Sequence, residues 1–179
     1  MRTLRRRSSA MVLLFAALCS ISSVAAARNV RKLALHDLDG NKTRLSDYQG
    51  RIVVVNFWAT WCGPCKEELP RLGEMAQQYA GQNVAFILIS IDEQKKLASV
   101  RDYIAQQKVR LPVWIGASID MLEQFSGTNI VPATLIVDEK GEIVRSINGE
   151  AQEGDVKQAL DWLLGGRKGP PLADHVKRY

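Results

Sequence analysis

Two long apolar runs, at residues 52–58 and 84–91, dominate the hydrophobic pattern of the chain. Runs of this kind are typical of strands that are covered on both faces of a parallel sheet. Between them, apolar residues recur at steps of three and four over about 62–80, which predicts an amphipathic helix that Pro70 should kink. Strand, helix and strand together predict a β-α-β unit, which is right-handed in almost all proteins.

Shorter patterns extend this unit on both sides. An Asp-Gly pair at 39–40, between two short apolar segments, is a strong signal for a tight hairpin turn. In chain order the further predicted elements are a β-hairpin within 29–51 with a helical turn at 46–48, a helix over 92–108, a strand at 111–115, a helix at 119–125, a hairpin with strands at 134–137 and 143–147, and a final helix over about 152–164 with Val156, Ala159, Leu160 and Leu163 facing inward.

The composition of the 179 residues is that of an ordinary globular protein, with 46% apolar and 24% charged residues. This length fits one domain with additions at its ends, and no internal repeat is present. We assign the domain to residues 28–166. Residues 167–179 are rich in glycine, proline and charge, and we predict a flexible C-terminal tail there.

Residues 1–27 have the three parts of an export signal. A basic segment at 2–7 precedes an apolar stretch at 10–18, and small residues follow at 25–27. We predict cleavage near Ala27. The alternative is an uncleaved membrane anchor, although the apolar region is near the lower length limit for a span and is diluted by serines.

The formal net charge of +5 does not indicate a nucleic-acid-binding surface. Four arginines within residues 1–27 account for most of it, so residues 28–179 carry only +1. The segment 167–179 carries +3, which leaves −2 for the predicted domain. Binding to a phosphate backbone requires a concentrated basic face, and we therefore predict no nucleic-acid partner.

Cys62 and Cys65 lie where the first buried strand leads into a helix, and the N-terminus of a helix favours a thiolate. A redox dithiol, half of a metal site and a structural disulfide are the three explanations for such a pair. A zinc site needs two more ligands, and outside the leader, which contains Cys19, the chain offers only His36 and His175. A disulfide across two residues closes too short a loop to stabilise much. The pattern therefore predicts a redox-active disulfide, with no metal and no other cofactor.

The positions of the two cysteines predict their roles. Cys62, at the exposed helix N-terminus, should attack the disulfide of a partner, and Cys65, which is more buried, should resolve the mixed disulfide. Gly63 and Pro64 shape the first helical turn, where proline is well tolerated. Trp61 is the aromatic residue that we expect to pack beside the site. For Trp58, packing beside the site and an ordinary core position are equally good interpretations.

Residues 56–70, Asn-Phe-Trp-Ala-Thr-Trp-Cys-Gly-Pro-Cys-Lys-Glu-Glu-Leu-Pro, resemble the active-site segment of thioredoxin-like proteins. Within that superfamily the chain is similar to the TlpA/ResA branch of exported, usually reducing, thiol–disulfide oxidoreductases. The resemblance covers about residues 30–165, including the segment 92–115 and the loop at 131–132. It implies an α/β thioredoxin fold, in which a central mixed sheet flanked by helices carries an N-terminal β-hairpin extension and a central α/β insertion.

The resemblance also implies that Pro132 is in the cis form and that its loop faces the dithiol. The backbone of Val131 would then be free to pair with an extended substrate segment near Cys62, so that Val131 and Pro132 join Trp61, Gly63 and Pro64 as candidate substrate-binding residues. From the residues alone, a trans proline at the start of a strand would be the expectation.

One departure from thioredoxins concerns proton transfer. Thioredoxins carry a buried aspartate where this chain has Asn56, and asparagine cannot take the proton that Cys65 loses. The TlpA/ResA pattern instead has a glutamate one helical turn after the second cysteine, which is Glu68 here. A buried glutamate with a raised pKa is a suitable proton acceptor. The alternative is that Glu68, like Glu67, is a solvated carboxylate on the helix surface.

These observations predict an exported thiol–disulfide oxidoreductase that mainly reduces its substrates. The Gly-Pro pair between the cysteines matches thioredoxin, whose reduction potential is about 150 mV below that of the oxidant DsbA. By resemblance, the substrates would be oxidised exported proteins, such as those of cytochrome c or copper-centre assembly. The electron donor would be a membrane protein of the DsbD/CcdA type, and the protein would be a periplasmic monomer.

Two alternatives use the same two thiols. A disulfide donor or isomerase would work in the opposite direction. A copper(I)-handling assembly factor would bind the metal through both thiolates, because copper(I) prefers soft ligands.

Overall fold

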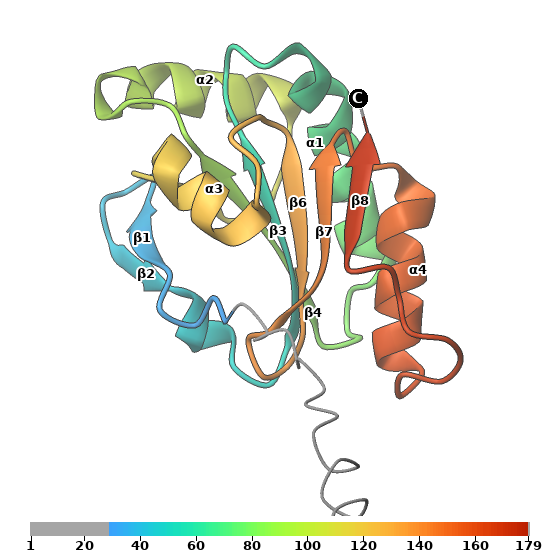
Figure 1. The fold of residues 1–179 in the computed structure, drawn as a ribbon. Coiled ribbons are helices and arrows are strands. Elements are labelled where there is room, and N and C mark those ends of the chain that lie inside the picture. The colour runs from blue at the N-terminus through green and yellow to red at the C-terminus, as the bar shows by residue number, and fades with distance from the viewer. Residues whose placement is uncertain (1–28, 179) are drawn as a thin grey trace, which may run out of the picture.

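The computed structural model describes residues 29–178 (Figure 1). In that range one mixed sheet has the strand order β2-β1-β5-β4-β3-β6-β7-β8. The strands are β1 (Ala34–Asp37), β2 (Lys42–Arg44), β3 (Ile52–Trp58), β4 (Val84–Ser90), β5 (Val113–Ile115), β6 (Ala133–Val137), β7 (Ile143–Gly149) and β8 (His175–Arg178). The helices are α1 (Gly63–Gln78), α2 (Leu97–Gln107), α3 (Ile119–Ser126) and α4 (Glu153–Leu164), with 3-10 turns at Leu45–Tyr48 and Gln94–Lys96.

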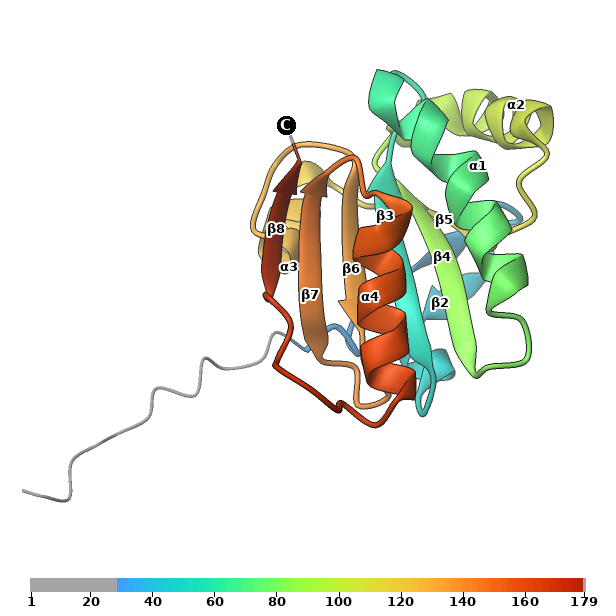
Figure 2. The same cartoon turned by 90° about the vertical axis from the view of Figure 1, so that its right-hand side faces the viewer.

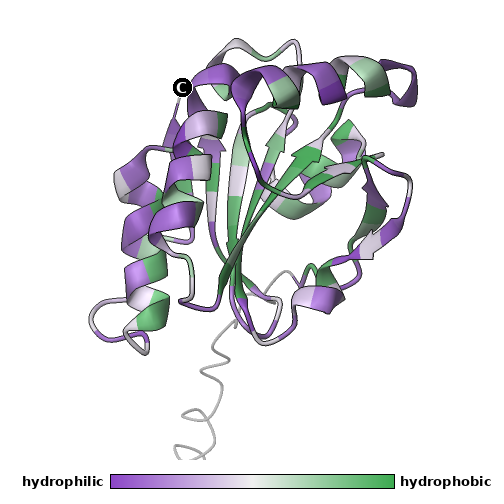
Figure 3. Ribbon diagram, turned by 180° about the vertical axis from the view of Figure 1, so that it is seen from behind, coloured by the Kyte–Doolittle hydropathy of each residue, from purple (hydrophilic) through white to green (hydrophobic). Residues whose placement is uncertain are grey.

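The centre of the sheet confirms the predicted thioredoxin fold. Strand β3 is parallel to β4 and antiparallel to β6, and every residue of β3 and β4 is buried. Helices α1 and α4 cover one face of the sheet, and α3 covers the other (Figure 2). The hydrophobic colouring is concentrated on the strands, whereas the helices carry hydrophilic residues on their outer surfaces (Figure 3).

Side chains of β3 alternate between two cores, because successive residues of a strand point to opposite faces of the sheet. Val53 and Val55 belong to the core that includes residues of α3. Val54 and Trp58 belong to the core that includes residues of α1 and α4. The same alternation puts Asn56 on the α1 side of the sheet, which brings a polar side chain under the helix that carries the cysteines.

The predicted N-terminal hairpin is confirmed as β1 and β2, and β1 joins the sheet by antiparallel pairing with β5. Its turn contains Gly40 with φ of +85°, a conformation that glycine adopts without steric cost. The predicted helix over 92–108 is shorter than expected, because α2 begins at Leu97. The side chain of Asp92 accepts hydrogen bonds from Thr60 instead of beginning this helix.

The prediction of a flexible tail over 167–179 is wrong for residues 175–178, which form β8 in parallel pairing with β7. Three ion pairs hold the segment in place: Arg178 contacts Asp155 at 2.6 Å, and Arg167 contacts Asp138 and, at 3.7 Å, Glu139. These partners lie far away in sequence, so the local composition could not reveal them. Strand β8 ends at the same edge of the sheet as the N-terminus of α1 (Figure 1).

The final helix buries Val156, Ala159, Leu160 and Leu163, as predicted. Between residues 29 and 178 no helix is long and apolar enough to cross a membrane. The predicted export signal at 1–27 lies outside the described residues.

Candidate active site

The two cysteines lie at the predicted junction between β3 and α1. Cys62 is the N-cap residue of α1, and its Sγ accepts a hydrogen bond from the backbone N–H of Cys65 at 3.2 Å. The sulfurs form a disulfide with an S–S distance of 2.03 Å. The backbone N–H of Cys62 donates to the carbonyl of Ala59 at 3.1 Å, which ties the first cysteine to the end of the strand. A sulfur at this position lies among the free N–H groups of the helix terminus, which favour a thiolate.

The exposure of the cysteines differs from the prediction. Cys62 is 4% exposed and Cys65 is 1% exposed, so the expected contrast between an exposed and a buried sulfur is small in the disulfide form. Both cysteines belong to the core on the α1 face of the sheet. Exposure at this site comes from neighbouring residues instead: Trp61 is 66% exposed, and Gly63 and Pro64 are also exposed.

A buried carboxylate that sequence reasoning missed fixes the loop before Cys62. Asp92, two residues after the end of β4, accepts hydrogen bonds from the backbone N–H of Thr60 at 2.9 Å and from its hydroxyl at 2.7 Å. The Ser90 hydroxyl also donates to Asp92, at 2.9 Å. An aspartate that directly follows a buried strand was the signal in the sequence, because the ends of parallel strands meet at one edge of the sheet.

Trp58 occupies a core position close to the dithiol, so the two interpretations offered for it are compatible. Its ring is fully buried and packs against Tyr103 of α2, with ring centroids 5.3 Å apart. Burial raises the pKa of the Tyr103 phenol, and the charge of Glu67 raises it further. The helix of the central insertion therefore covers the strand end that leads to the cysteines.

Three side chains from three elements meet below α1. Asn56 of β3 pairs with Thr134 of β6 in the sheet, and Glu68 of α1 reaches both of them. The amide nitrogen of Asn56 donates to Glu68 Oε1 at 3.1 Å and to the Thr134 hydroxyl at 2.9 Å, and that hydroxyl donates to Glu68 Oε1 at 2.8 Å. Glu68 is 0% exposed, so the solvated-surface alternative is wrong for this residue.

Burial raises the pKa of Glu68 from 4.5 to about 7, against the opposing effect of the Thr134 hydrogen bond. Its second oxygen, Oε2, is buried without a hydrogen-bond partner among the described residues. A carboxyl group with this pKa is close to half protonated at neutral pH, so it is able both to accept and to release a proton. Glu67, by contrast, is exposed, as expected.

The Val131–Pro132 peptide bond is cis, as predicted. It directly precedes β6, whose first residue Ala133 pairs with Phe57 near the end of β3. Pro132 therefore lies at the edge of the sheet from which the loop to Cys62 departs. Its carbonyl accepts a hydrogen bond from the backbone N–H of Gly149 at 2.9 Å.

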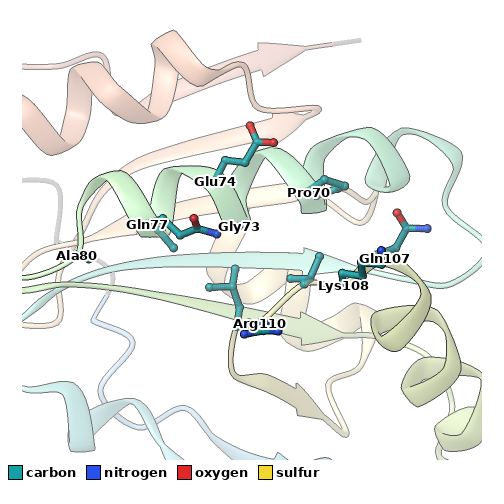
Figure 4. Close-up of a pocket in the computed structure, with 11 residues that line it drawn as sticks. Pro70, Gly73, Glu74, Gln77, Ala80, Gln107, Lys108 and Arg110 are labelled. Atoms are coloured by element: carbon teal, nitrogen blue, oxygen red, sulfur yellow. The ribbon is translucent and has the colours of Figure 1, made fainter.

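A groove with a volume of about 800 Å³ lies elsewhere on the described residues (Figure 4). It runs between the second half of α1 and the connection from α2 to β5. The lining residues include Pro70, Glu74, Gln107, Lys108 and Arg110, but neither cysteine nor Glu68. This groove is therefore separate from the redox site, where Trp61, Gly63 and Pro64 are the exposed residues beside the disulfide. Within residues 29–178, no cluster of three or more His, Cys, Asp or Glu side chains is arranged to hold a metal.

Comparisons with known proteins agree with this geometry. Residues 26–146 match the AhpC/TSA family. The thiol–disulfide oxidoreductase ResA of Geobacillus thermodenitrificans is 31% identical over 140 residues, which are 78% of this chain and 79% of that protein.

Two solved structures show the same fold. One is a thiol:disulfide interchange protein of the thioredoxin family from Chlorobium tepidum, with a TM-score of 0.67, 25% identity and coverage of 79% of this chain and 99% of that one. The other is the exposed lipoprotein thioredoxin of Streptococcus pneumoniae, with a TM-score of 0.63, 27% identity and coverage of 73% and 98%. The chain therefore belongs to the AhpC/TSA family and, within its thioredoxin-like members, to the ResA thiol–disulfide oxidoreductases.

Proposed function

We propose that this oxidoreductase is exported and reduces disulfides in other exported proteins of the periplasm, with Cys62 as the nucleophile and Cys65 as the resolving thiol. Three features support this direction and location. The leader at 1–27 has the pattern of an export signal, and the Gly-Pro pair between the cysteines is that of reducing thioredoxin. The similar lipoprotein thioredoxin of Streptococcus pneumoniae is described as exposed.

The exchange begins with the reduced protein. The Cys62 thiolate attacks one sulfur of the substrate disulfide, which forms a mixed disulfide and releases the other substrate sulfur as a thiolate. The Cys65 thiolate then attacks Cys62 Sγ, which forms the Cys62–Cys65 disulfide and releases the second substrate sulfur. Two electrons pass to the substrate, and its two thiolates take up two protons from water. Cys62 has already released its proton to water as it became a thiolate, and the proton of Cys65 goes to Glu68.

In this proposal Glu68 takes the proton of Cys65. The main observation that supports the proposal is the burial of the Glu68 carboxyl. Asn56 and Thr134 both donate to Oε1, so Oε2 is the oxygen left to receive a proton. A pKa of about 7 lets Glu68 accept a proton at neutral pH and return it when the enzyme is reduced again. Because Glu68 lies one turn after Cys65 on the same helix, no rearrangement of the fold is needed to keep the two groups near each other.

Substrate binding is assigned to the exposed surface around the disulfide. Trp61, Gly63 and Pro64 are exposed, and Val131 is half-buried in the loop that precedes β6. An extended substrate segment that pairs with the backbone of Val131 would bring its disulfide toward Cys62. Pro132 holds this loop at the edge of the sheet through its hydrogen bond with Gly149.

A reducing enzyme outside the cytoplasm needs a supply of electrons. Resemblance to the TlpA/ResA branch supports a membrane reductant of the DsbD/CcdA type as donor. It also supports substrates from cytochrome c or copper-centre assembly, and a monomeric enzyme.

Two experiments test the proposal. Equilibration with glutathione should give a reduction potential near that of thioredoxin, about −270 mV, whereas a value near that of DsbA, about −120 mV, would reverse the direction. Trapping tests the roles of the cysteines: Cys65→Ala should accumulate mixed disulfides with oxidised insulin as a model substrate. The matched control is Cys62→Ala, which should accumulate far fewer; equal accumulation by both variants would contradict the assignment of Cys62 as nucleophile.

A further inference from the structure

One ion pair connects the catalytic helix to the segment that covers Glu68. Arg71 lies three residues after Glu68 on α1, and its guanidinium contacts Glu150 Oε1 at 2.6 Å. Glu150 belongs to the short segment 150–152 between β7 and α4. The side chains of this ion pair are 28% and 31% exposed, so the pair is partly shielded from water and is worth more than an open surface pair.

The segment 150–152 lies directly over the Glu68 carboxyl. Ala151 is buried in the core on the α1 face, and its backbone lies close enough to the Glu68 carboxyl to lower the pKa of that group. The start of the segment is also fixed, because the N–H of Gly149 donates to the carbonyl of Pro132 at 2.9 Å. Beyond this point, the contact between Arg71 and Glu150 joins the segment to α1, beside the packing of Ala151 in the core.

We infer that Arg71 and Glu150 are positioning residues: their ion pair holds the segment 150–152 against Glu68, keeps water away from the carboxyl, and thereby sets the pH at which Glu68 exchanges its proton with Cys65. This inference rests on the proposed role of Glu68 as proton acceptor. It adds two residues that contact each other and act on the site through the segment 150–152.

The groups that face Glu68 allow two effects of the ion pair on the Glu68 pKa to be separated: the effect of its charges and its effect on the burial of the carboxyl. Of the charged groups, Arg71 lowers the pKa of Glu68 and Glu150 raises it, and both effects are smaller than that of burial. Strands β3 and β6 present only the neutral Asn56 and Thr134, and the reduced enzyme adds the thiols one turn away on α1.

The two possible effects of Arg71 have opposite signs. If Arg71 acted only through its charge, its removal would raise the pKa of Glu68 further. If it acts by holding the segment in place, its removal admits water to the carboxyl and also moves the Ala151 backbone away, which by itself would raise the pKa. Burial has the larger effect, so the net change lowers the pKa toward 4.5. The direction of the change therefore distinguishes the two mechanisms.

The experiment measures the rate of insulin disulfide reduction by the pre-reduced full chain, in single turnover, from pH 5 to pH 9. Arg71→Gln should move the midpoint of the Glu68-dependent step to lower pH by about one unit, because partial solvation removes part of the burial effect. In a Glu68→Gln background the same substitution should cause no shift. Lys157→Gln removes one positive charge from another 2.6 Å ion pair on α4 and is the matched control, for which no shift is expected.

A second measurement does not depend on the stability of Arg71→Gln. Glu150→Gln breaks the ion pair from the side of the segment 150–152. In this variant, hydrogen exchange of the backbone at 149–152 should become at least about tenfold faster than in the wild type. Unchanged exchange, or a midpoint that stays constant or moves to higher pH in Arg71→Gln, would overturn the inference. If Glu68→Gln itself leaves the pH profile unaltered, the role of Glu68 fails; if it alters the profile and Arg71→Gln does not, only this inference fails.

Discussion

Replacing Glu68 with glutamine should change how the free energy of unfolding depends on pH. Burial raises the pKa of Glu68 from 4.5 to about 7 in the folded protein, and unfolding returns the carboxyl to water and to its ordinary value. Between these two values the folded protein holds a proton that the unfolded chain has released. The stabilisation from this proton is complete below about pH 4.5 and is lost as the pH rises through about 7.

The size of the effect follows from the difference of about 2.5 pH units between the two pKa values. At 1.36 kcal/mol per unit, the wild type should lose roughly 3 kcal/mol of stability between pH 4.5 and pH 8 through this group. In Glu68→Gln the amide oxygen still accepts the hydrogen bonds from Asn56 and Thr134, but the side chain does not titrate. The variant should therefore lack this pH dependence and become relatively more stable above pH 7.

Urea unfolding of the oxidised protein, repeated from pH 4.5 to pH 8.5, measures this difference. The oxidised form is chosen because Cys62 and Cys65 are joined in the disulfide and do not titrate. The matched control is Glu67→Gln, which removes the same charge from an exposed neighbouring position and should give a difference that is flat with pH. A flat difference for Glu68→Gln as well would refute the argument that burial controls this carboxyl.

Two further substitutions test the supports of the site. Asp92→Ala leaves the N–H and hydroxyl of Thr60 without their acceptor and should lower the free energy of unfolding by about 2 kcal/mol in urea at pH 7; an unchanged midpoint would contradict this. Gly149→Ala would put a β-carbon into the carbonyl oxygen of Arg178, at a φ of +94°. This substitution should expose β8 to proteolysis and lower the free energy of unfolding by at least about 1 kcal/mol. Gly154→Ala, which has open space around it, should leave β8 protected.

The part of the fold that the sequence predicted well is the part encoded by continuous patterns. The buried runs at 52–58 and 84–91 became β3 and β4 with the predicted bounds to within one residue. The Cys62–Cys65 pair was placed correctly because strand, turn and helix signals follow one another without interruption. Glu68 was a correct candidate for burial because its position relative to the cysteines is fixed by the helix alone.

The parts that could not be predicted depend on contacts between distant segments. Strand β8 exists because its four residues pair with β7, which no local pattern of a Gly- and Pro-rich segment records. Thr134 meets Asn56 through the register of β3 and β6, and Arg71 meets Glu150 across 79 positions of sequence. The low exposure of Cys62 likewise reflects packing in the core and not its place at the helix N-terminus.

The location of the acid on α1 has a mechanical consequence. A carboxylate on the strand, as in thioredoxins, depends on the packing of helix against sheet for its distance to the resolving cysteine. Here Glu68 and Cys65 share one helix, so the helix itself fixes their spacing, and the sheet supplies only the neutral donors Asn56 and Thr134. What remains adjustable is the access of water to the carboxyl. Because burial has the largest effect on the pKa of Glu68, the segment 150–152 that covers it is the element through which this site is tuned.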